Sequence, residues 1–473
     1  MPLVLWAAAS PANAELAARV AGLTSSGCHA TSTCLPVPGS PHTRENRPRR
    51  STMQVRSWSR SAGHDLTSAC RPTDLDRGAT RMTANQFDHL DPGLAPVMNE
   101  VFAAFRSNCP VAHSDRHGGF WSAFSHGAVR STALDTRGFS SAAGIAIPPV
   151  TQDVVMAPMQ YDPPEHAAFR AIIQKHFTRA AVAKHEAALR ELVGRRLSAL
   201  AAEGGADLVS EFAAVIPPIA FAEVMGLPHE DAQLFVSWTN ELFAAAVMGD
   251  LAGQQRTFGI IASYLQTEID RQRRAGADTV TTAIADGRLD GDGRALTQGE
   301  QLGMILLLVL AGHETTVAGI ATMLYCLATV DGLREKVVER PDLIGKMVDE
   351  SLRFESPVIG IARTVGQDAE LAGQSLHAGE RVLMVLSSAN RDPEVFDRPD
   401  EFVCPRDRNP HLTFGTGVHR CVGEHLSLLE MRVVAEEVLR LVPDFTLVEG
   451  HRPRWVPGRL VRSLDSLPVT FER

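Results

Sequence analysis

The longest apolar stretch of the chain, residues 302–330, constrains the fold more than any other feature. A capping-box sequence at 297–300 precedes it, so we expect one helix of roughly thirty residues, from Leu302 to about Thr329. A helix this long and apolar either crosses the core of a large protein or spans a membrane. Because His313, Glu314 and two threonines interrupt it at its centre, which is costly in lipid, the sequence predicts a buried core helix.

The composition agrees with a globular enzyme built around such a core. The 473 residues are 44% hydrophobic and 21% charged, and the net charge of −9 argues against a nucleic-acid partner. The seven cysteines show no short metal-binding spacing, which favours a reducing compartment. The first residues resemble a secretion signal only faintly, because a basic segment is missing. We therefore expect a cytoplasmic protein without a membrane anchor.

Residues 1–81 differ in character from the rest of the chain. They are rich in Ser, Thr, Pro and Arg and show little apolar periodicity, so we expect a mostly disordered extension. It is interpreted either as a basic docking arm or as a dispensable tail or mis-assigned start, with translation beginning at Met82. The second interpretation is favoured because a recognisable catalytic domain, residues 82–473, begins directly after it.

Shorter patterns complete the expected architecture of mostly helices with a small β region. Apolar periodicity predicts helices at 96–106 and through most of 180–297, and alternation predicts strands near 119–124 and 381–386. Residues 145–159 form an apolar, proline-punctuated loop able to cover a pocket, and residues 459–471 are expected to form a closing hairpin.

The polar run inside the long helix, residues 311–316, is the first candidate site. A core helix normally avoids an acid and two hydroxyls. Gly312 removes side-chain bulk and Thr315 can donate to a carbonyl one turn back, so we expect a local widening of the helix. The plain alternative is a packing kink in which Glu314 pairs with a basic residue.

The second candidate is the glycine-rich loop 414–423, which presents Cys421 just before a predicted helix. The unpaired N–H groups and dipole of that helix favour a thiolate, the form that ligates metals. The plain alternative is a buried free cysteine that acts as a small hydrophobe.

Two further pairs carry charge at helical spacing. His166 and Arg170 lie four apart on one predicted helix face and could bind an anion, although a solvated face would look the same. Glu350 and Arg353 lie three apart, a spacing that is common on protein surfaces and means little alone.

In order and spacing, these motifs resemble those of the cytochrome P450 family over about residues 82–473. The matches are D-P-P-E-H-x-x-x-R at 162–170, A-G-x-E/D-T-T at 311–316, E-x-x-R at 350–353 and F-x-x-G-x-x-x-C-x-G at 414–423. The resemblance implies the P450 fold, mainly α with a small β region, in which a long central helix lies over a haem and the cysteine loop beneath it.

The resemblance also implies the site residues. Cys421 would ligate the iron of haem b, and Glu314 and Thr315 would be the catalytic pair that relays protons for dioxygen activation. The cofactor-binding residues would be His166, Arg170, Ala311, Gly312, Arg363, Phe414, Gly415, His419, Cys421 and Gly423. Among them, His166, Arg170, Arg363 and His419 would hold the haem propionates, since buried carboxylates need paired donors. Arg406 would complete Glu350 and Arg353 as a structural triad.

The function so implied is a haem-thiolate monooxygenase that hydroxylates or oxidatively dealkylates a hydrophobic small molecule. Its electrons would come from a separate ferredoxin and ferredoxin reductase, because the chain carries no flavin or iron–sulfur signature, and a basic face at Arg420 would receive the acidic partner. We expect a monomer. The expected pocket residues are Met304, Leu307, Leu308, Ala311, Ile359 and Ile361.

Two alternatives stay open from sequence. One is haem-thiolate chemistry other than hydroxylation, such as desaturation or coupling. The other is a haem-binding sensor or carrier, which would have no need of Glu314 and Thr315.

Overall fold

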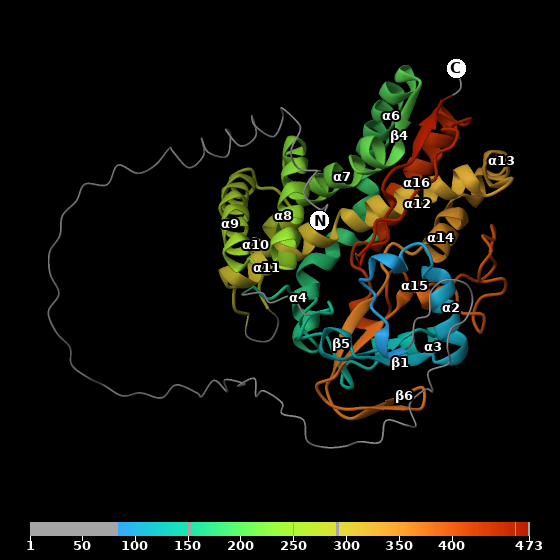
Figure 1. The fold of residues 1–473 in the computed structure, drawn as a ribbon. Coiled ribbons are helices and arrows are strands. Elements are labelled where there is room, and N and C mark those ends of the chain that lie inside the picture. Colours follow the sequence, from blue (N-terminus) through green and yellow to red (C-terminus); the bar gives the residue numbers. More distant parts are fainter. Residues whose placement is uncertain (1–83, 149–153, 249, 290–292, 459, 472–473) are drawn as a thin grey trace, which may run out of the picture. The chain divides into compact units, whose positions relative to one another are not determined.

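The computed structural model describes residues 84–148, 154–248, 250–289, 293–458 and 460–471 (Figure 1). All of them belong to one compact unit. The expectations for residues 1–81, and those for the middle of the loop 145–159, lie outside the described residues.

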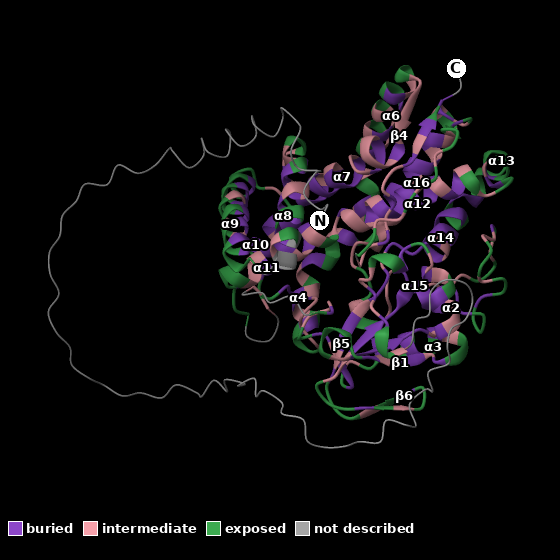
Figure 2. Ribbon diagram, in the orientation of Figure 1, coloured by how far each residue is buried: buried purple, intermediate pink, exposed green. Residues whose placement is uncertain are grey.

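The mainly helical fold is confirmed. The longer helices are α2 Met98–Asn108, α3 His126–Leu134, α4 Glu165–Gln174, α6 Glu186–Glu203, α7 Ile216–Met225, α8 Ala232–Met248, α9 Leu251–Arg274, α11 Gln298–Ala311, α12 Glu314–Thr329, α14 Ile344–Phe354 and α16 Glu424–Leu441. The shorter helices are α5 Arg179–Val182, α10 Val280–Ala285, α13 Leu333–Glu339 and α15 Leu386–Ala389. Helices α12, α14 and α16 pack against one another and are largely buried, whereas the outer face of α9 is exposed (Figure 2).

The long central helix is interrupted, so the expectation of one continuous helix is wrong. Helix α11 ends at Ala311 and α12 begins at Glu314, with His313 between them at φ −126° and ψ −47°. The interruption lies at Gly312, where a Cβ atom would come within 2.6 Å of the Phe221 ring. The predicted bond of Thr315 to a carbonyl one turn back is confirmed, because its Oγ1 donates to the Ala311 carbonyl at 3.2 Å.

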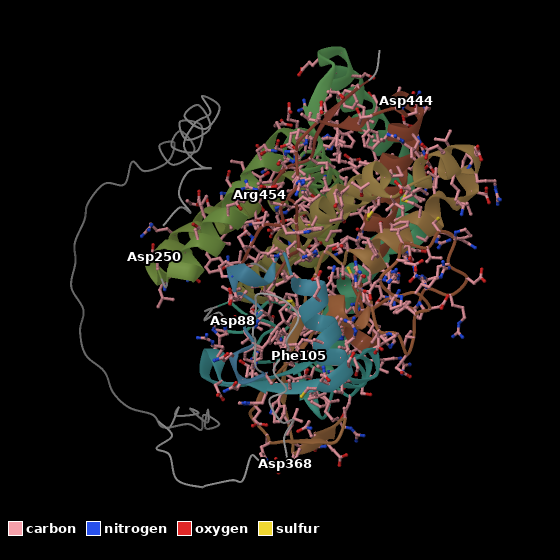
Figure 3. All side chains as sticks on the ribbon, turned by 45° about the vertical axis from the view of Figure 1, so that its right-hand side comes forward. Asp88, Phe105, Asp250, Asp368, Asp444 and Arg454 are labelled. Carbon is pink, nitrogen blue, oxygen red and sulfur yellow. The ribbon has the colours of Figure 1, made fainter. Side chains whose placement is uncertain are left out.

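The small β region is confirmed as a five-stranded sheet in the order β1-β2-β8-β5-β3. Its strands are β1 Val111–Ser114, β2 Phe120–Ala123, β3 Phe139–Ser140, β5 Ile361–Val365 and β8 Arg381–Met384. Strands β2 and β8 pair in parallel and the other neighbours are antiparallel. Phe105 of α2 stacks on Phe124, which follows β2, with ring centroids 4.4 Å apart (Figure 3 labels Phe105). This aromatic packing joins the helix to the sheet.

Two smaller sheets complete the described part. Strand β10 Pro468–Thr470 lies between β4 Gly205–Asp207 and β9 Thr446–Leu447, and β6 Ala369–Leu371 pairs with β7 Gln374–Leu376. The closing hairpin expected at 459–471 lies slightly earlier in the chain. Its arms meet at Trp455 and Leu464, and β10 pairs with other segments instead.

Two helical stretches among the described residues, Leu208–Met225 and Gln298–Thr329, are long and apolar enough to cross a membrane. In the 18-residue window of each stretch that meets this criterion, 61% is buried inside the protein. Among the described cysteines, Cys326, Cys404 and Cys421 are free.

Candidate active site

The cysteine loop turns through two glycines in the left-handed region. Gly415 has φ 67° and Gly417 has φ 72°, and a Cβ atom on Gly417 would lie 3.0 Å from the Ala133 carbonyl oxygen at the end of α3. The Cys421 N–H donates to the Phe414 carbonyl at 2.8 Å, which closes the loop two residues before Gly423 caps α16. The turn thus requires glycine at both positions, and the close approach of the loop to α3 requires it at Gly417 as well.

Cys421 is a free, solvent-exposed residue whose sulfur has protein atoms on its other sides. This desolvation raises the pKa of the thiol, although a hydrogen bond from Gly423 and the charges of Arg170 and Arg420 act to lower it. The thiolate that the helix N-terminus is expected to favour at Cys421 stays a prediction, since the residue is exposed while desolvation acts against the charged form.

Four basic side chains gather from three separate parts of the chain. Helix α4 places His166 and Arg170 on one face, β5 carries Arg363, and the turn before Cys421 carries His419. The rings of His166 and His419 have centroids 4.3 Å apart, and Arg170 and Arg363 act on the pKa values of both. The predicted propionate-binding residues are thus brought together.

In this basic set His166 and Arg363 are buried and Arg170 and His419 are half-buried, and the described carboxylate that acts on it is Asp162. Arg363 is 5% exposed, and burial lowers its pKa to about 10; its described hydrogen bond goes to the Ala362 carbonyl at 2.9 Å. Burial also lowers the pKa of Arg170, and the only described group that opposes this is Cys421. One carboxylate does not balance two guanidinium groups, and burying the excess positive charge is costly. The set therefore fits a ligand with two carboxylates, as haem has, with Cys421 available as the iron ligand.

Two residues that sequence reasoning missed support this set. Ser141 Oγ lies 3.2 Å from His419 Nε2 and donates to Asp162 Oδ1 at 3.1 Å. Asp162 also accepts hydrogen bonds from the Ser141 N–H at 2.9 Å and from the Ser140 hydroxyl. Asp162 stands inside the motif at 162–170 and could have been found there, whereas nothing in the sequence singles out Ser141.

The helix interruption presents the predicted catalytic pair. Ala311 is exposed, Gly312, Glu314 and Thr315 are half-buried, and Glu314 is the first residue of α12. One residue later, Thr316 Oγ1 donates to Ser427 Oγ of α16 at 3.3 Å. The interruption is thereby joined to the helix that follows Cys421.

The expected pocket residues divide into two groups. Met304, Leu308 and Ile359 are at most 6% exposed and pack within the core. Leu307, Ile361 and Ala311 retain open surface and remain available to a ligand.

The predicted structural triad is confirmed. Glu350 and Arg353 are fully buried and form two hydrogen bonds, of 2.9 and 2.7 Å. Arg406 completes the triad through bonds of 2.9 and 3.1 Å to the same carboxylate, to which the Val403 N–H also donates at 2.8 Å.

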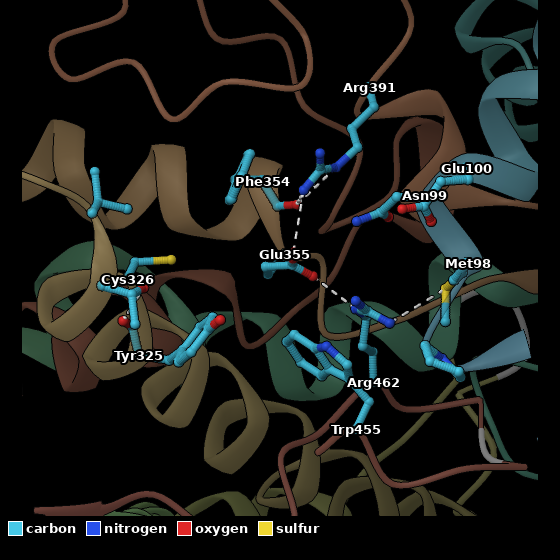
Figure 4. Close-up of a pocket in the computed structure, with 13 residues that line it drawn as sticks. Met98, Asn99, Glu100, Tyr325, Cys326, Phe354, Glu355, Arg391, Trp455 and Arg462 are labelled. Atoms are coloured by element: carbon cyan, nitrogen blue, oxygen red, sulfur yellow. Dashed lines mark hydrogen bonds and ion pairs between the residues drawn. The ribbon is translucent and has the colours of Figure 1, made fainter. Parts of the chain in front are cut away.

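A separate cavity of about 320 Å³ lies where the C-terminal tail meets α2, α12 and α14 (Figure 4). Buried Glu355 accepts from Arg462 at 2.7 Å and from Arg391 at 3.2 Å, and the Arg462 guanidinium lies 3.7 Å from the centre of the Trp455 ring. None of the residues lining this cavity is a predicted site residue. These ion pairs anchor the tail to the core.

Taken together, a free cysteine in a glycine-rich turn before a helix, an interrupted core helix and a buried basic set define the class of helical haem-thiolate proteins. Comparison with known proteins agrees. The family model described as Cytochrome P450 matches residues 254–446. Cytochrome P450 130 of Mycobacterium tuberculosis is 31% identical over 403 residues, which cover 82% of this chain and 98% of that protein.

Two further proteins are similar. Cytochrome P450 monooxygenase PikC of Streptomyces venezuelae is 33% identical over 319 residues, covering 67% of this chain and 76% of that protein. The solved structure of the bacillaene polyketide synthase cytochrome P450 PksS of Bacillus subtilis has a TM-score of 0.74 and 26% identity, covering 82% of this chain and all of that one. The chain belongs to the cytochrome P450 family. It is a monooxygenase with a haem-thiolate cofactor, a small-molecule substrate and redox partners.

Proposed function

We propose that this monooxygenase binds haem b through Cys421 and uses dioxygen, with electrons from a separate ferredoxin and its reductase, to hydroxylate a hydrophobic small molecule in the cytoplasm. The observation that carries the proposal is the partly buried set of His166, Arg170, Arg363 and His419, which has more positive groups than the single carboxylate of Asp162 can balance, beside a free cysteine. Such a set suits an iron-bearing ligand with two carboxylates.

The remaining proposed cofactor residues would contact the flat faces of the haem. Ala311 and Gly312 would do so from the helix interruption, and Phe414, Gly415 and Gly423 from the cysteine loop. Small residues at four of these five positions keep the backbone accessible to a planar ligand.

Haem bound through a thiolate supplies the redox chemistry that splits dioxygen and places one oxygen atom in a C–H bond. The chain's own contribution is to deliver protons. The Thr315 hydroxyl donates a hydrogen bond to the Ala311 carbonyl at 3.2 Å. Because a hydroxyl can accept one hydrogen bond while it donates another, it can pass on its own proton and receive a replacement. Glu314, the adjacent acid, is proposed to resupply that proton.

The substrate and redox partner are proposed from the surfaces available to them. Leu307, Ile361 and Ala311 are the apolar residues with open surface, which favours a hydrophobic substrate. Arg420 is exposed as expected, but its guanidinium makes two 2.6 Å hydrogen bonds to Glu424, so this face is less basic than the sequence alone indicates. A ferredoxin would therefore have to compete for, or add to, this ion pair.

The test is the absorption spectrum of the dithionite-reduced protein with carbon monoxide, in which a thiolate-ligated haem gives a red-shifted band. We expect the band in the wild type and in Cys326→Ala, a matched control at another free cysteine, and its loss in Cys421→Ser. Haem binding without the band in the wild type would contradict the proposal and favour a sensor or carrier.

Hydroxylation is tested separately once a substrate has been found by spin-state screening. Turnover under ¹⁸O₂ should place one labelled oxygen in the product. An unlabelled product with a new double bond or a new carbon–carbon bond would instead indicate desaturation or coupling.

A further inference from the structure

Three side chains with metal-ligating atoms gather in the β region, apart from the proposed haem site. The ligand atoms of Asp88, His89 and His117 all lie within 4.8 Å of one another. Asp88 and His89 belong to the segment before α2, and Figure 3 labels Asp88. His117 stands in the turn 116–118 between β1 and β2. The cluster thus joins two segments that are separate in the chain.

His89 is the most informative member of this group. The residue is 2% exposed, and neither of its ring nitrogens makes a hydrogen bond of normal geometry with a described residue, although the Ile147 backbone lies close enough to act on its pKa. Its ring packs edge-on against the rings of His117 and Phe120, with centroids 5.9 and 5.6 Å away. A buried imidazole without a well-placed polar partner is costly, and among the described residues only the Ile147 backbone approaches it, so the ring has the capacity to bind a further group.

The other two members are already held in place. Asp88 Oδ1 accepts from the Leu90 N–H at 2.9 Å and lies 2.9 Å from His117 Nε2. His117 adopts φ 53° in the left-handed region, a conformation that costs energy for a residue other than glycine. The strained turn and the anchored carboxylate fix the position of the His117 ring, which is the kind of preorganisation that a binding site needs.

We propose that Asp88, His89 and His117 bind a divalent transition-metal ion, with Zn²⁺ the best match. Two imidazoles and one carboxylate form a common zinc ligand set, with a water molecule as the fourth ligand. Ligand atoms at zinc-bond lengths in tetrahedral geometry are separated by about 3.3 Å. The Asp88–His117 pair, at 2.9 Å, is close to that spacing, and the His89 ring would need to move by up to about 1.5 Å.

The proposed ion has a structural role. It would cross-link the segment before α2 to the β1–β2 hairpin at the edge of the five-stranded sheet. It would also give the buried His89 its missing partner. The proposal does not depend on the identity of the substrate or on the haem chemistry.

The test measures zinc on the haem-loaded, full-length protein. Each protein is treated with a chelator and then dialysed against Zn²⁺, and its zinc content is measured by elemental analysis. The wild type should contain one more zinc ion per chain than His117→Ala. His117→Ala and Asp88→Asn should weaken zinc binding at least tenfold. The matched control is His113→Ala, because His113 lies on the same hairpin but outside the cluster, and it should bind zinc like the wild type.

A second readout separates binding from misfolding. Zinc should raise the thermal midpoint of the wild type and of His113→Ala, and should leave that of His117→Ala unchanged, while all three keep the same haem content. Equal zinc content in all variants would show adventitious binding and overturn the proposal. Absence of zinc from the wild type would overturn it as well, and would mean that water satisfies His89.

Discussion

The rings of His166 and His419 meet edge-on, with centroids 4.3 Å apart and planes at 62°, although one residue belongs to α4 and the other to the turn before Cys421. Burial lowers the pKa of both, that of His419 to about 3, and the nearby Arg170 and Arg363 lower them further. Neutral imidazoles beside two guanidinium groups form a site that accepts carboxylates and rejects cations.

Arg363→Gln should weaken haem binding. The variant removes one guanidinium that is 5% exposed, and hydrogen bonds to charged groups are worth about 1.5–3 kcal/mol each, so haem affinity should fall about tenfold to a hundredfold. Haem per protein, measured by the pyridine haemochrome assay, checks this. The control is Arg195→Gln, which removes an exposed arginine paired with Glu191, and unchanged haem content in Arg363→Gln would refute the role.

Thr315→Ala should separate electron use from product formation. Haem content and the carbon monoxide spectrum should stay as in the wild type, while a larger share of the reducing equivalents appears as hydrogen peroxide, because a proton donor has been removed. The matched control is Thr329→Ala on the same helix, whose hydroxyl donates to the carbonyl four residues earlier at 2.7 Å. Equal coupling in the two variants would exclude the proton-relay role.

Glu350→Gln should destabilise the fold. The substitution leaves Arg353 and Arg406 buried without their carboxylate, and breaking a buried ion pair costs about 3–5 kcal/mol. Glu191→Gln, which breaks an exposed pair with Arg195, should cost about 1 kcal/mol or less. Urea midpoints of the two variants measured side by side check the difference, which should vanish if the triad has no structural role.

Glu430→Gln should change how stability depends on pH. Glu430 of α16 is 1% exposed, one of its carboxylate oxygens has no described partner, and burial raises its pKa well above 4.5. Above pH 4.5 the unfolded chain releases this proton while the folded protein keeps it, so stability falls as pH rises toward the folded pKa. The variant should lack this contribution and gain stability relative to the wild type as pH rises.

Denaturant midpoints from pH 5 to 8 measure this effect. The control is Glu436→Gln on the same helix, where the carboxylate pairs with Arg190 and Arg432 instead of lying unpaired. A stability difference between wild type and Glu430→Gln that stays constant over this range would contradict the assignment.

Much of the candidate site was predictable because its key residues stand in short motifs. The turn around Cys421 follows from its glycines, and the bond of Thr315 to the Ala311 carbonyl follows from their helical spacing. The buried pair of Glu350 and Arg353 was predicted from the family motif, because their spacing alone is common on surfaces. The position of Arg406 opposite that pair was also predicted, from the family resemblance, and is confirmed. The family resemblance therefore predicted a contact between distant parts of the chain, Arg406 with Glu350, that residue spacing does not specify.

The sequence by itself determined the helical class, the cysteine loop and the charged motifs, because each depends on residues that are neighbours in the chain. Only the tertiary structure decided the interruption of the central helix, where Phe221 leaves no room for a Cβ atom on Gly312. It also decided that desolvation opposes the helix terminus at the thiol of Cys421, and that His89 is buried beside Asp88 and His117. Burial and desolvation arise where distant segments pack together, and local patterns do not encode which segments those are.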